Sequence, residues 1–426
     1  MGVRVRVVLL TYGSRGDVEP FVALGKGLQG AGHSVRLAAP ALFERLALSH
    51  GIDYIPLPGD PDHLVQDLVQ QAGTRPWRMV TVMSRYVLPL AERVAGAVRE
   101  ACKGADAVVH SFLMTQAGHE AAHDFGVADI SAQLFPVFST TGEFPAPAFP
   151  DLPLGRAYRR LTHAITTQTF RQGGRMLYGR VRRGAPHLPP LSRWPFAAVP
   201  GERPPILYAF SPRVVPPPAD WAHDVHITGY WFLDPPGGWQ PPPGLLDFLD
   251  AGPPPVYVGF GSITARDGGR LMAVALEALA LSRQRGVLGM GQHRLPDRDW
   301  PSNAYVIGSV PHCWLFPRMA AVVHHGGAGT TGAGLRAGVP NVIVPFTADQ
   351  PFWGRQVFRL GVGPRPIPVH RLSAAKLAQA ISTAMEDSAM RTRAQALGEY
   401  IRAEEGVLRA MEVICAARRG LATEER

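Results

Sequence analysis

Val322–Gly354, with the sequence VVHHGGAGTTGAGLRAGVPNVIVPFTADQPFWG, decides the fold of this chain. Its first two residues are apolar and β-branched, and they predict the end of a buried strand. A turn rich in histidine and glycine follows, and a helix is expected to begin near Ala328. A second apolar run, Val342–Phe346, predicts another strand, after which Asp349 and Gln350 follow. Strand, helix and strand in this order predict one unit of a parallel sheet.

The turn between the first strand and the helix has the residues of an anion site. Glycines such as Gly326 and Gly327 let the backbone approach a ligand closely, and the unpaired N–H groups at a helix start attract negative charge. Thr330 and Thr331 add hydroxyl donors, and His325 adds an imidazole donor. The lysine of a Walker loop is absent, and so is a strict GxGxxG followed by a ribose-binding acid. The sequence therefore predicts a diphosphate site of a less common type.

The same alternation of apolar strands and helical spacing runs through both halves of the chain. Strands that alternate with helices predict parallel sheets covered on both faces, with ligands beyond the carboxyl ends of the strands. Proline-rich segments at 211–221 and 234–243 interrupt the alternation and bracket a change of domain. We therefore expect an α/β protein with two doubly wound sheets. The expected strands are Val5–Leu10, Val35–Ala38, Ala107–His110, Ile130–Leu134, Ile206–Phe210, Val256–Phe260, Val287–Met290, Tyr305–Val310, Ala321–His324 and Asn341–Pro345.

The composition is that of a globular protein. A length of 426 residues suits two domains of roughly 200 residues each. Hydrophobic residues make up 46% and charged residues 18%, which excludes a disordered chain. Neither a signal peptide nor an apolar run of roughly 18 residues is visible. The three cysteines are odd in number and far apart, which favours a reducing compartment, so a cytoplasmic location is expected.

The net charge of +9 comes almost wholly from arginine. A basic surface is typical of proteins that bind nucleic acid, an anionic membrane or an anionic small ligand. The arginines are scattered, apart from short groups such as Arg156–Arg160 and Arg180–Arg183, and no basic stripe alternates with aromatic residues. Nucleic-acid binding is therefore not expected, and a solvated arginine-rich surface is the preferred interpretation. Peripheral membrane contact stays open, and the sequence does not indicate an oligomeric state.

Four segments together resemble the family 1 glycosyltransferases of GT-B fold. Val322–Gly354 resembles their nucleotide-sugar signature and is most similar to that of the sterol 3-β-glucosyltransferase branch. Thr11–Pro20 is similar to the loop on the acceptor side of these proteins. Tyr257–Ser262 is similar to the first strand and turn of the donor domain, and Val310–Pro317 to the segment that lines the nucleoside. The order of the four segments is that of the family, which makes a chance match very improbable.

The resemblance implies two Rossmann-like domains that face one another. It places an acceptor-binding domain at 1–215, a nucleotide-sugar-binding domain at 216–405, and a C-terminal helix at 406–426 that crosses back to the first domain. It implies an inverting, metal-independent transfer of a hexose from a UDP-sugar, with glucose favoured, to a hydroxyl of a lipophilic acceptor. The nucleotide sugar is then a co-substrate, and no further cofactor is expected. Two Asp-x-Asp pairs, at 60–62 and 297–299, resemble the metal sites of GT-A enzymes but are interpreted as surface turns.

Glycosyl transfer needs a base for the acceptor hydroxyl and donors for the departing diphosphate. Asp17 follows the first strand and is the first candidate base, with a helix N-cap as its alternative role. His110, at the end of a later strand, is the second candidate. In plant relatives with a histidine base an aspartate at this place orients that histidine, and here the two residue types are exchanged, so either Asp17 or His110 could hold the proton. The alternative role of His110 is a strand-end histidine bonded to a backbone carbonyl. His119 and His123 are spaced four apart on a predicted helix, lack a third metal ligand and are interpreted as a helix-face pair.

The resemblance assigns the donor contacts residue by residue. Asp349 and Gln350 fall at the positions that bind sugar hydroxyls, and Val310 falls at one whose backbone pairs with the pyrimidine edge. The alternative for the glycines is a turn kept for helix–sheet packing, and the alternative for Asp349 and Gln350 is a turn that begins a helix. The other residues assigned to the donor are Ser14, Gly261, Ser262, His325, Gly327, Gly329 and Thr330.

At two positions the sequence differs from the plant relatives, so it does not restrict the donor to a UDP-sugar. Ile307 stands where those relatives have a tryptophan beneath the uracil, and Ala333 stands where a glutamate binds both ribose hydroxyls. A 2′-deoxyribose donor, a dTDP-sugar used in natural-product glycosylation, therefore stays open beside UDP-glucose.

The acceptor region is expected in loops of the first domain, at 60–90 and 135–185. Methionine and aromatic residues there suit a roomy apolar pocket, although such residues are more often core. Sterol, triterpenoid, polyketide and flavonoid acceptors all fit. An epimerase or hydrolase of similar fold, and a non-catalytic nucleotide-sugar-binding protein, are the remaining alternatives. The residues in question are Trp77, Met79, Met83, Phe135, Phe138, Phe144 and Phe149.

Overall fold

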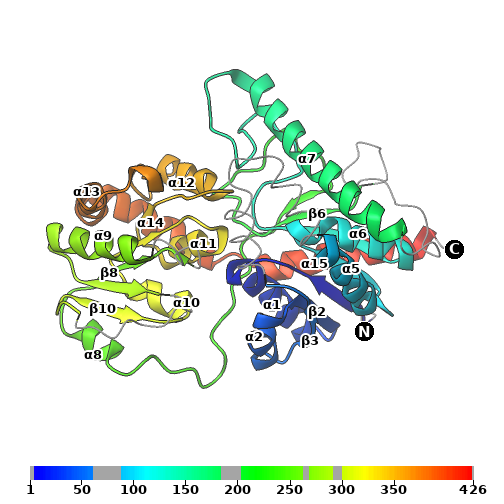
Figure 1. Ribbon diagram of the computed structural model, residues 1–426, viewed down its shortest axis with the longest axis horizontal. Helices are drawn as coiled ribbons and strands as arrows, with labels where there is room; N and C mark the ends of the chain where they lie inside the picture. Colours follow the sequence, from blue (N-terminus) through cyan, green and yellow to red (C-terminus); the bar gives the residue numbers. More distant parts are fainter. Residues whose placement is uncertain (1–3, 61–87, 184–202, 262–267, 291–299, 425–426) are drawn as a thin grey trace.

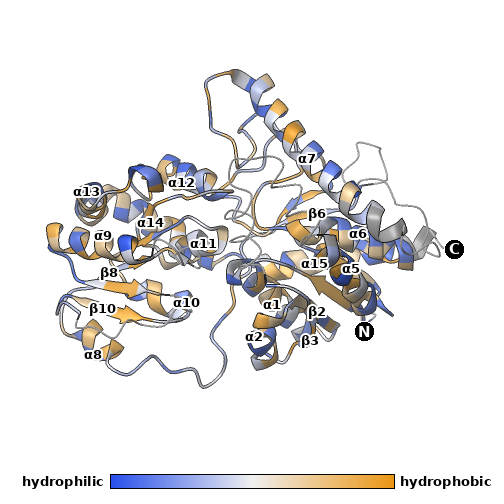
Figure 2. Cartoon of the chain, in the orientation of Figure 1, coloured by the Kyte–Doolittle hydropathy of each residue, from blue (hydrophilic) through white to orange (hydrophobic). Residues whose placement is uncertain are grey.

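Two parallel sheets, each covered by helices on both faces, form the body of the protein (Figure 1). The computed structural model describes residues 4–60, 88–183, 203–261, 268–290 and 300–424. In Figure 2 the strands are mostly hydrophobic along their whole length, whereas the helices alternate between hydrophobic and hydrophilic residues. This is the pattern expected where strands are buried on both faces and helices on one.

The first sheet has seven strands within the described residues, in the order β3-β2-β1-β4-β5-β6-β7, and all are paired in parallel. The central strand explains its two layers, since its side chains alternate between faces. Val7 and Leu9 pack with helix α1, while Val8 and Leu10 pack with α5 and α6. The strands are β1 Arg6–Leu10, β2 Ser34–Pro40, β3 Asp53–Leu57, β4 Ala107–His110, β5 Ala128–Gln133, β6 Ile206–Tyr208 and β7 Val225–Ile227. The helices are α1 Arg15–Gly30, α2 Glu44–Ser49, α5 Leu88–Cys102, α6 Thr115–Phe125 and α7 Gly155–Arg183, with short 3-10 turns η1 Ala41–Phe43 and η3 Phe112–Met114.

The second sheet has five strands within the described residues, in the order β10-β9-β8-β11-β12, again all parallel. The same alternation separates Val323, which packs beside α9 and α13, from Val322, which packs on the opposite face. The strands are β8 Val256–Gly259, β9 Gly286–Gly289, β10 Ala304–Ile307, β11 Ala321–His324 and β12 Asn341–Ile343. The helices are α8 Leu245–Asp250, α9 Gly268–Leu281, α10 His312–Leu315, α11 Ala328–Ala337, α12 Gln350–Arg359, α13 Ala374–Glu386, α14 Ser388–Arg402 and α15 Gly406–Glu424, with 3-10 turns η5 Phe316–Arg318 and η6 Val369–Arg371.

One apolar cluster joins the two domains. Phe210, just after β6, contacts Trp353 of α12 with ring centroids 5.8 Å apart. Phe144, in the loop before α7, contacts Phe352 of the same helix at 5.5 Å. All four side chains are buried and belong to one cluster that also includes Leu335 of α11 and Ile401 of α14. A shared apolar core of this kind restricts how far the domains can move apart.

The last helix, α15, returns to the first domain and packs on α1. Ala410 and Ile414 are fully buried in the same cluster as β1. Gly27 of α1 has no room for a side chain, because an added Cβ would lie 2.2 Å from Val407 Cγ1. Figure 1 shows α15 beside the first sheet, on the far side of the molecule from α9 and α13.

The structure differs from the sequence-based expectation in α7 and in the two edge strands of the first sheet, β3 and β7, which were not among the expected strands. Residues 155–183, expected within a loop, form the long helix α7. The first sheet extends to β7, beyond the boundary expected at 215, because this three-residue strand is only half-buried and lies between two proline-rich segments. The C-terminal part of the chain forms two helices, α14 and α15, that are separated at 403–405, and α15 begins at Gly406, where the C-terminal helix was expected to begin.

Candidate functional site

The turn between β11 and α11 is held in shape by His324. The Gly326 N–H donates to His324 Nδ1 at 3.1 Å, which leaves Nε2–H to donate to Asn341 Oδ1 at 2.9 Å. Asn341 Nδ2 in turn donates to the Val339 carbonyl at 2.8 Å. Burial lowers the pKa of His324 to about 3, so the ring is neutral at neutral pH and this tautomer suits its two partners. The first histidine of the pair is therefore structural.

The second histidine of the pair lies at the mouth of the turn. The ring of His325 lies between two glycines: a Cβ added to Gly261 would be 3.0 Å from its Cε1, and one added to Gly327 would be 2.6 Å from its Nε2. Its Nδ1 is buried without a hydrogen-bond partner among the described residues. Burial lowers the pKa of His325 to about 4, so the free protein holds a neutral imidazole here. A buried ring nitrogen with no protein partner is suited to bind a ligand.

The amino end of α11 supplies backbone donors beside this imidazole. Gly327 is the N-cap, and Gly329 and Thr330 lie half-buried in the first turn. Thr331 is fully buried, so only one of the two threonine hydroxyls expected to bind a ligand is near the surface. A neutral imidazole, a hydroxyl and free helix N–H groups make a site for an anion.

The amino end of α1 meets the amino end of α11. A Cβ added to Gly329 would lie 3.5 Å from the carbonyl oxygen of Gly16, an ordinary van der Waals distance, so the backbones of the two domains lie close together here. Arg15 Nη1 donates a hydrogen bond to Ser309 Oγ of the second domain. Two helix amino ends and one guanidinium therefore converge, and each favours negative charge between them.

Asp17 lies in the first turn of α1, where it caps the helix without being its N-cap residue. The N–H and hydroxyl groups of Ser14, the actual N-cap, both donate to Asp17 Oδ2, at 2.7 and 2.9 Å. The Thr11 hydroxyl donates to the Asp17 carbonyl at 3.0 Å. The carboxylate is thus held at the edge of the first domain that faces α11 and α12. Ser14, assigned to the donor by resemblance, is in this structure the partner of Asp17.

The Asp349–Gln350 turn begins α12 and has its own fixed geometry. Gln350 Oε1 accepts the Phe346 and Thr347 N–H groups at 2.8 and 3.2 Å, so only the amide NH2 can serve a ligand. Trp353 Nε1 donates to Asp349 Oδ2 at 2.8 Å. Ala348, just before this pair, has a φ of +57°, a left-handed conformation that a non-glycine residue adopts at a cost of about 1 kcal/mol. Such local strain is concentrated at functional turns.

Asp349 has the most perturbed carboxyl of this region. Although part of the residue is exposed, its carboxyl is surrounded by protein, and this burial raises its pKa to about 7. The Trp353 hydrogen bond lowers the pKa, and the negative charge of Asp17 raises it. Asp349 and Asp17 are therefore close enough to interact across the domain boundary.

His110 occupies a different environment from Asp17. Its side chain is fully buried at the end of β4, and its Nε2 is bonded to Asp129 Oδ1 at 2.8 Å. Asp129 Oδ2 also bonds His119 Nδ1 at 2.6 Å, and the two histidines together lower the pKa of Asp129 despite its burial. His110 thus pairs with a carboxylate that the sequence did not point to, and it is part of the packing of α6 on β4. Gly118 of α6 lies directly against its ring.

The remaining positions on the donor side have different outcomes. Ser262 lies outside the described residues, whereas Gly261 has a φ of +69° and lies against His325. Val310 is buried next to α10, at the start of the segment expected to line a nucleoside. Ile307 is 3% exposed inside the second domain, so its side chain is not placed to stack on a base. His312, stacked on Phe316 at 4.3 Å, has a pKa lowered by burial to about 3.

Aromatic side chains gather in the part of the first domain that was expected to bind the acceptor. Phe112, Phe135, Phe138 and Phe170 contact one another with ring centroids 4.5–5.8 Å apart. Phe138 has a φ of +69°, which a bulky residue rarely adopts. Phe144 is buried against α12, and Trp77, Met79 and Met83 lie outside the described residues.

The sequence analysis missed two residues of the site, and only one of them carries no signal in the sequence taken alone. Asp129 becomes a partner of His110 and His119 only through the pairing of β4 with β5. Trp353 could have been found, because it follows Asp349 by four residues at the start of a helix, the spacing at which side chains meet.

No helix in the described ranges is long and apolar enough to cross a membrane. Nor do those ranges contain three or more His, Cys, Asp or Glu side chains arranged so that they could hold a metal ion.

Two family models match parts of the chain. The "Glycosyltransferase family 28 N-terminal domain" matches residues 7–119, and the "Erythromycin biosynthesis protein CIII-like, C-terminal domain" matches residues 287–406. The first includes Asp17 and His110, and the second includes the turn at His325 and the Asp349–Gln350 pair.

Similar curated proteins fall into two groups. O-mycaminosyltylonolide 6-deoxyallosyltransferase of Streptomyces fradiae is 40% identical over 96% of this chain and 97% of its own length. Sterol 3-beta-glucosyltransferases of Arabidopsis thaliana and Cryptococcus neoformans are each 35% identical over 96% of this chain. The chain spans 65% of the length of the Arabidopsis protein and 27% of that of the Cryptococcus protein.

Solved structures of the same shape are more distant in sequence. The glycosyltransferase of kitacinnamycin superposes with a TM-score of 0.70 at 21% identity, over 98% of this chain and 100% of that one. A calicheamicin glycosyltransferase superposes with a TM-score of 0.70 at 17% identity, over 98% of both chains. At these identities the likeness concerns the fold alone.

Proposed function

Because this chain belongs to the family 1 glycosyltransferases of GT-B fold, in their sterol 3-beta-glucosyltransferase-like branch, we propose that it transfers a hexose from a UDP-sugar to a hydroxyl of a lipophilic acceptor, with glucose as the favoured sugar and inversion at the anomeric carbon. The observation that carries this proposal is the junction of α1 and α11. There an imidazole whose Nδ1 has no partner among the described residues, two helix amino ends and an aspartate come together from two domains.

The second domain binds the diphosphate in this proposal. His325, the Thr330 hydroxyl and the first N–H groups of α11 donate to the phosphate oxygens. The neutral state of His325 in the free protein is consistent with this role, because a bound dianion raises the pKa of an adjacent imidazole and draws a proton to it. These donors stabilise the charge that develops on the diphosphate as it leaves.

Asp17 is the proposed base. Its carboxylate takes the proton of the acceptor hydroxyl while the hydroxyl oxygen forms a bond to the anomeric carbon. The bond from that carbon to the diphosphate oxygen breaks, and the nucleoside diphosphate departs with the electron pair. Ser14 and Thr11 hold Asp17 in place. His110, being buried and bonded to Asp129, is assigned to the support of this face of the domain.

Asp349 and Gln350 are proposed to bind the sugar hydroxyls. The amide NH2 of Gln350 is a donor, since its oxygen is used by two backbone N–H groups. The carboxylate of Asp349 is an acceptor when ionised. A donor and an acceptor side by side suit a sugar that carries adjacent hydroxyls.

A second candidate function is transfer of a deoxysugar from a dTDP-sugar to a macrolide-type acceptor. It is favoured by the relative named 6-deoxyallosyltransferase, which matches this chain over nearly its whole length. Ala333 is compatible with it, because no carboxylate stands there to bind a ribose 2′-hydroxyl. A hexose lacking one hydroxyl would still find a partner in the Asp349–Gln350 pair.

The test is a matrix of donors and acceptors read by mass spectrometry. UDP-glucose, dTDP-glucose and a dTDP-6-deoxyhexose are each combined with a sterol, a flavonoid and a macrolide aglycone. Product with UDP-glucose supports the first function, and product only with the deoxyhexose supports the second. Tight binding of donor in calorimetry without product, and without any effect of Asp17→Asn, would indicate a non-catalytic binding protein. Free sugar released without acceptor would indicate a hydrolase. The cytoplasmic location, the metal independence and peripheral membrane contact stay predictions.

A further inference from the structure

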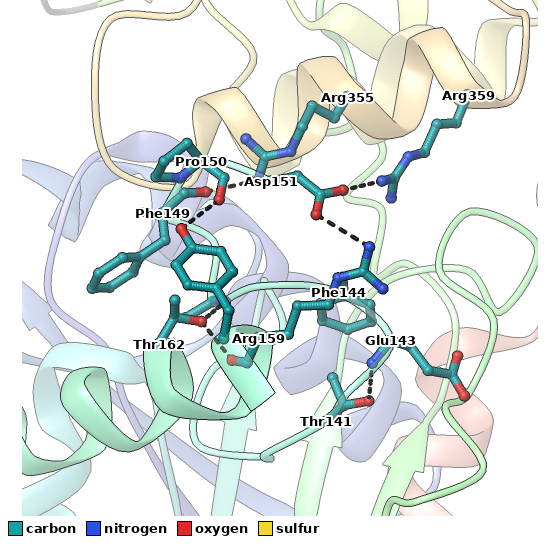
Figure 3. Close-up of polar contacts among 12 residues, drawn as sticks. Thr141, Glu143, Phe144, Phe149, Pro150, Asp151, Arg159, Thr162, Arg355 and Arg359 are labelled. Atoms are coloured by element: carbon teal, nitrogen blue, oxygen red, sulfur yellow. Dashed lines mark hydrogen bonds and ion pairs between the residues drawn. The ribbon is translucent and has the colours of Figure 1, made fainter. Parts of the chain in front are cut away.

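Asp151 connects the two domains through a cluster of arginines. It lies in the loop before α7, and its side chain is only 12% exposed. Arg159, from α7 of the same domain, approaches Asp151 Oδ1 at 3.4 Å. Arg359, at the end of α12 in the second domain, pairs with Asp151 Oδ2. Figure 3 shows the carboxylate between these two guanidinium groups.

A second arginine of α12 contacts the same loop. Arg355 Nη2 donates to the carbonyl oxygen of Phe149 at 3.2 Å. Arg355 and Arg359 are one helical turn apart, so both reach the loop from one face of α12, as Figure 3 shows. Beside them, Phe144 of the loop packs on Phe352. The loop at 144–151 therefore contacts α12 through a ring pair, a hydrogen bond and an ion pair.

The position of α12 matters because its first residues are those assigned to the sugar. Asp349 is its N-cap, Gln350 its first residue, and Trp353 holds the Asp349 carboxylate. A helix of ten residues moves as a rigid unit, so a displacement at Arg359 is transmitted to Asp349. Asp17, in contrast, is fixed to the first domain. The spacing between Asp17 and Asp349 therefore depends on what holds α12 against that domain.

We propose that Asp151 is a positioning residue for glycosyl transfer: its pairing with Arg359 holds α12, and with it the sugar-binding turn, at the correct place relative to the base on the first domain. The inference rests on the proposed function for the role of Asp17 and Asp349. The tie between the domains is a separate statement, which can be tested without any acceptor.

The two arginines of Asp151 differ in what they connect, and this offers a matched control. The loop has other ties to its own domain: Tyr158 OH donates to Pro150 O at 2.8 Å, and the Ala146 N–H donates to Thr162 Oγ1 at 2.9 Å. Loss of Arg159 therefore leaves the loop anchored within the first domain. Loss of Arg359 removes a contact that crosses to the second domain and leaves a nearly buried carboxylate with a weaker partner.

The experiment compares Arg359→Ala, Asp151→Asn, Arg359→Lys and the control Arg159→Ala. Titration calorimetry gives the affinities for UDP and for UDP-glucose, and for a dTDP pair if the donor screen selects dTDP. Arg359→Ala is expected to keep the UDP affinity, because His325 and α11 lie wholly in the second domain. It is expected to weaken binding of the sugar nucleotide relative to UDP, and to lower kcat by about tenfold to a hundredfold, the usual effect of misplacing groups by around an ångström. Arg359→Lys should recover most of this loss, and Arg159→Ala should show little of it.

Amide hydrogen exchange tests the contact between α12 and the loop at 144–151 directly, without the need for transfer activity. Arg359→Ala should speed exchange in the loop at 144–151 and in the last turn of α12, whereas Arg159→Ala should leave α12 unchanged. Equal loss of kcat in Arg159→Ala and Arg359→Ala would overturn the proposal, because the cluster would then only stabilise the loop. Unchanged kinetics and exchange in Arg359→Ala would overturn it as well. If the wild-type protein transfers no sugar, the proposed function is contradicted instead. The hydrogen-exchange result and the ratio of the UDP-glucose affinity to the UDP affinity still show whether the Asp151–Arg359 contact holds α12 against the first domain.

Discussion

Asp349 and Asp17 belong to different domains, and the negative charge of Asp17 acts on the carboxyl group of Asp349 across the boundary between them. Burial raises the pKa of Asp349 to about 7, and the negative charge of Asp17 contributes to that increase. Asp349 therefore changes its protonation state near neutral pH, and the residue proposed as the base helps to set where it does so. This coupling leads to measurable predictions.

The affinity for the sugar nucleotide should depend on the protonation of Asp349 and therefore on pH. The affinity for UDP, which lacks the sugar, should depend much less on the protonation of Asp349. If Asp349 accepts a sugar hydroxyl as a carboxylate, binding of UDP-glucose strengthens as pH rises through about 7 and weakens by up to about tenfold per pH unit below it. Asp17→Asn removes a negative charge and should move this transition to lower pH. Calorimetry at pH 5.5 to 8.5, at roughly unit steps, measures both. Identical pH profiles for UDP and UDP-glucose would place Asp349 away from the sugar.

Trp353→Phe should move the same transition in the opposite direction. The variant loses the Nε1–H donor that lowers the pKa of Asp349, so the carboxyl should ionise only at higher pH. Because Trp353 is fully buried, the free energy of unfolding should also fall by about 2–4 kcal/mol. Opposite shifts in Asp17→Asn and Trp353→Phe, at equal UDP affinity, identify the titrating group. Shifts in the same direction would show that another group titrates.

Substitution of His325 should lower the affinity for UDP, whereas substitution of the adjacent His324 should lower stability. His325→Ala removes a ligand donor, so UDP affinity should fall by about tenfold or more, since a hydrogen bond to a charged group is worth roughly 1.5–3 kcal/mol. Its stability should change little, because the buried Nδ1 has no partner to lose among the described residues. His324→Ala breaks the bonds to Gly326 and Asn341, so stability should fall by about 1–3 kcal/mol. Calorimetry and denaturant unfolding measure both, and unchanged UDP affinity in a folded His325→Ala protein would contradict the assignment.

Substitution of the proposed base, Asp17, should affect turnover, whereas substitution of His110 should affect stability. Asp17→Asn keeps a side-chain oxygen that can accept from Ser14 and loses only the charge that favours a helix amino end, so stability should fall by at most about 1 kcal/mol. Turnover should fall by about 10²–10⁴-fold, while UDP affinity survives. His110→Ala should instead destabilise the first domain by about 1–3 kcal/mol, because Asp129 loses one of its two histidine partners. A His110→Ala protein of normal stability but without turnover would return the base to His110.

The second domain should lose stability in mild acid. His312, His324 and His325 titrate near pH 6.5 in the unfolded chain but have folded pKa values of about 3, 3 and 4. Between pH 6.5 and 4 the unfolded chain therefore binds more protons, and stability falls as pH is lowered, by roughly 1.4 kcal/mol per pH unit for each histidine. Asp349 acts in the opposite direction, because its folded pKa of about 7 lies above its ordinary value of 3.8. These four groups together predict a net uptake of about two protons on unfolding at pH 5. Urea titrations at several pH values check the slope, and stability that is constant from pH 7 to 4.5 would contradict these assignments.

The sequence was informative where apolar runs are buried on both faces. Ala107–His110 and Ala321–His324 were predicted with their observed bounds, and α11 begins at Ala328 as expected. The GT-B architecture was confirmed. The strands β3 and β7 were missed, because the first contains a proline and the second has three half-buried residues, so neither has a strong apolar pattern.

The candidate site was predictable only in part. His325, Gly327 and Gly329 lie together because they are adjacent in the chain around one turn. The contact of Gly16 with Gly329, and that of Asp151 with Arg359, join residues that are far apart in sequence. Such contacts depend on how two complete domains pack, and no local spacing of residues indicates them. The individual roles of Asp17, His325, Asp349 and Gln350 stay predictions.

The apolar cluster that joins the domains bears on how this enzyme could be recombined with its relatives. A hybrid protein whose halves meet between β7 and β8 would take Phe144 and Phe210 from one parent and Phe352 and Trp353 from the other. Because close-packed side chains tolerate few changes of volume, the two parents must match at these positions. The C-terminal helix α15 adds a second condition, since it comes from one parent but packs on α1 of the other. Exchange of specificity between relatives is therefore expected to succeed by transplanting loops within one domain, or by moving α12 and α15 together with the first half.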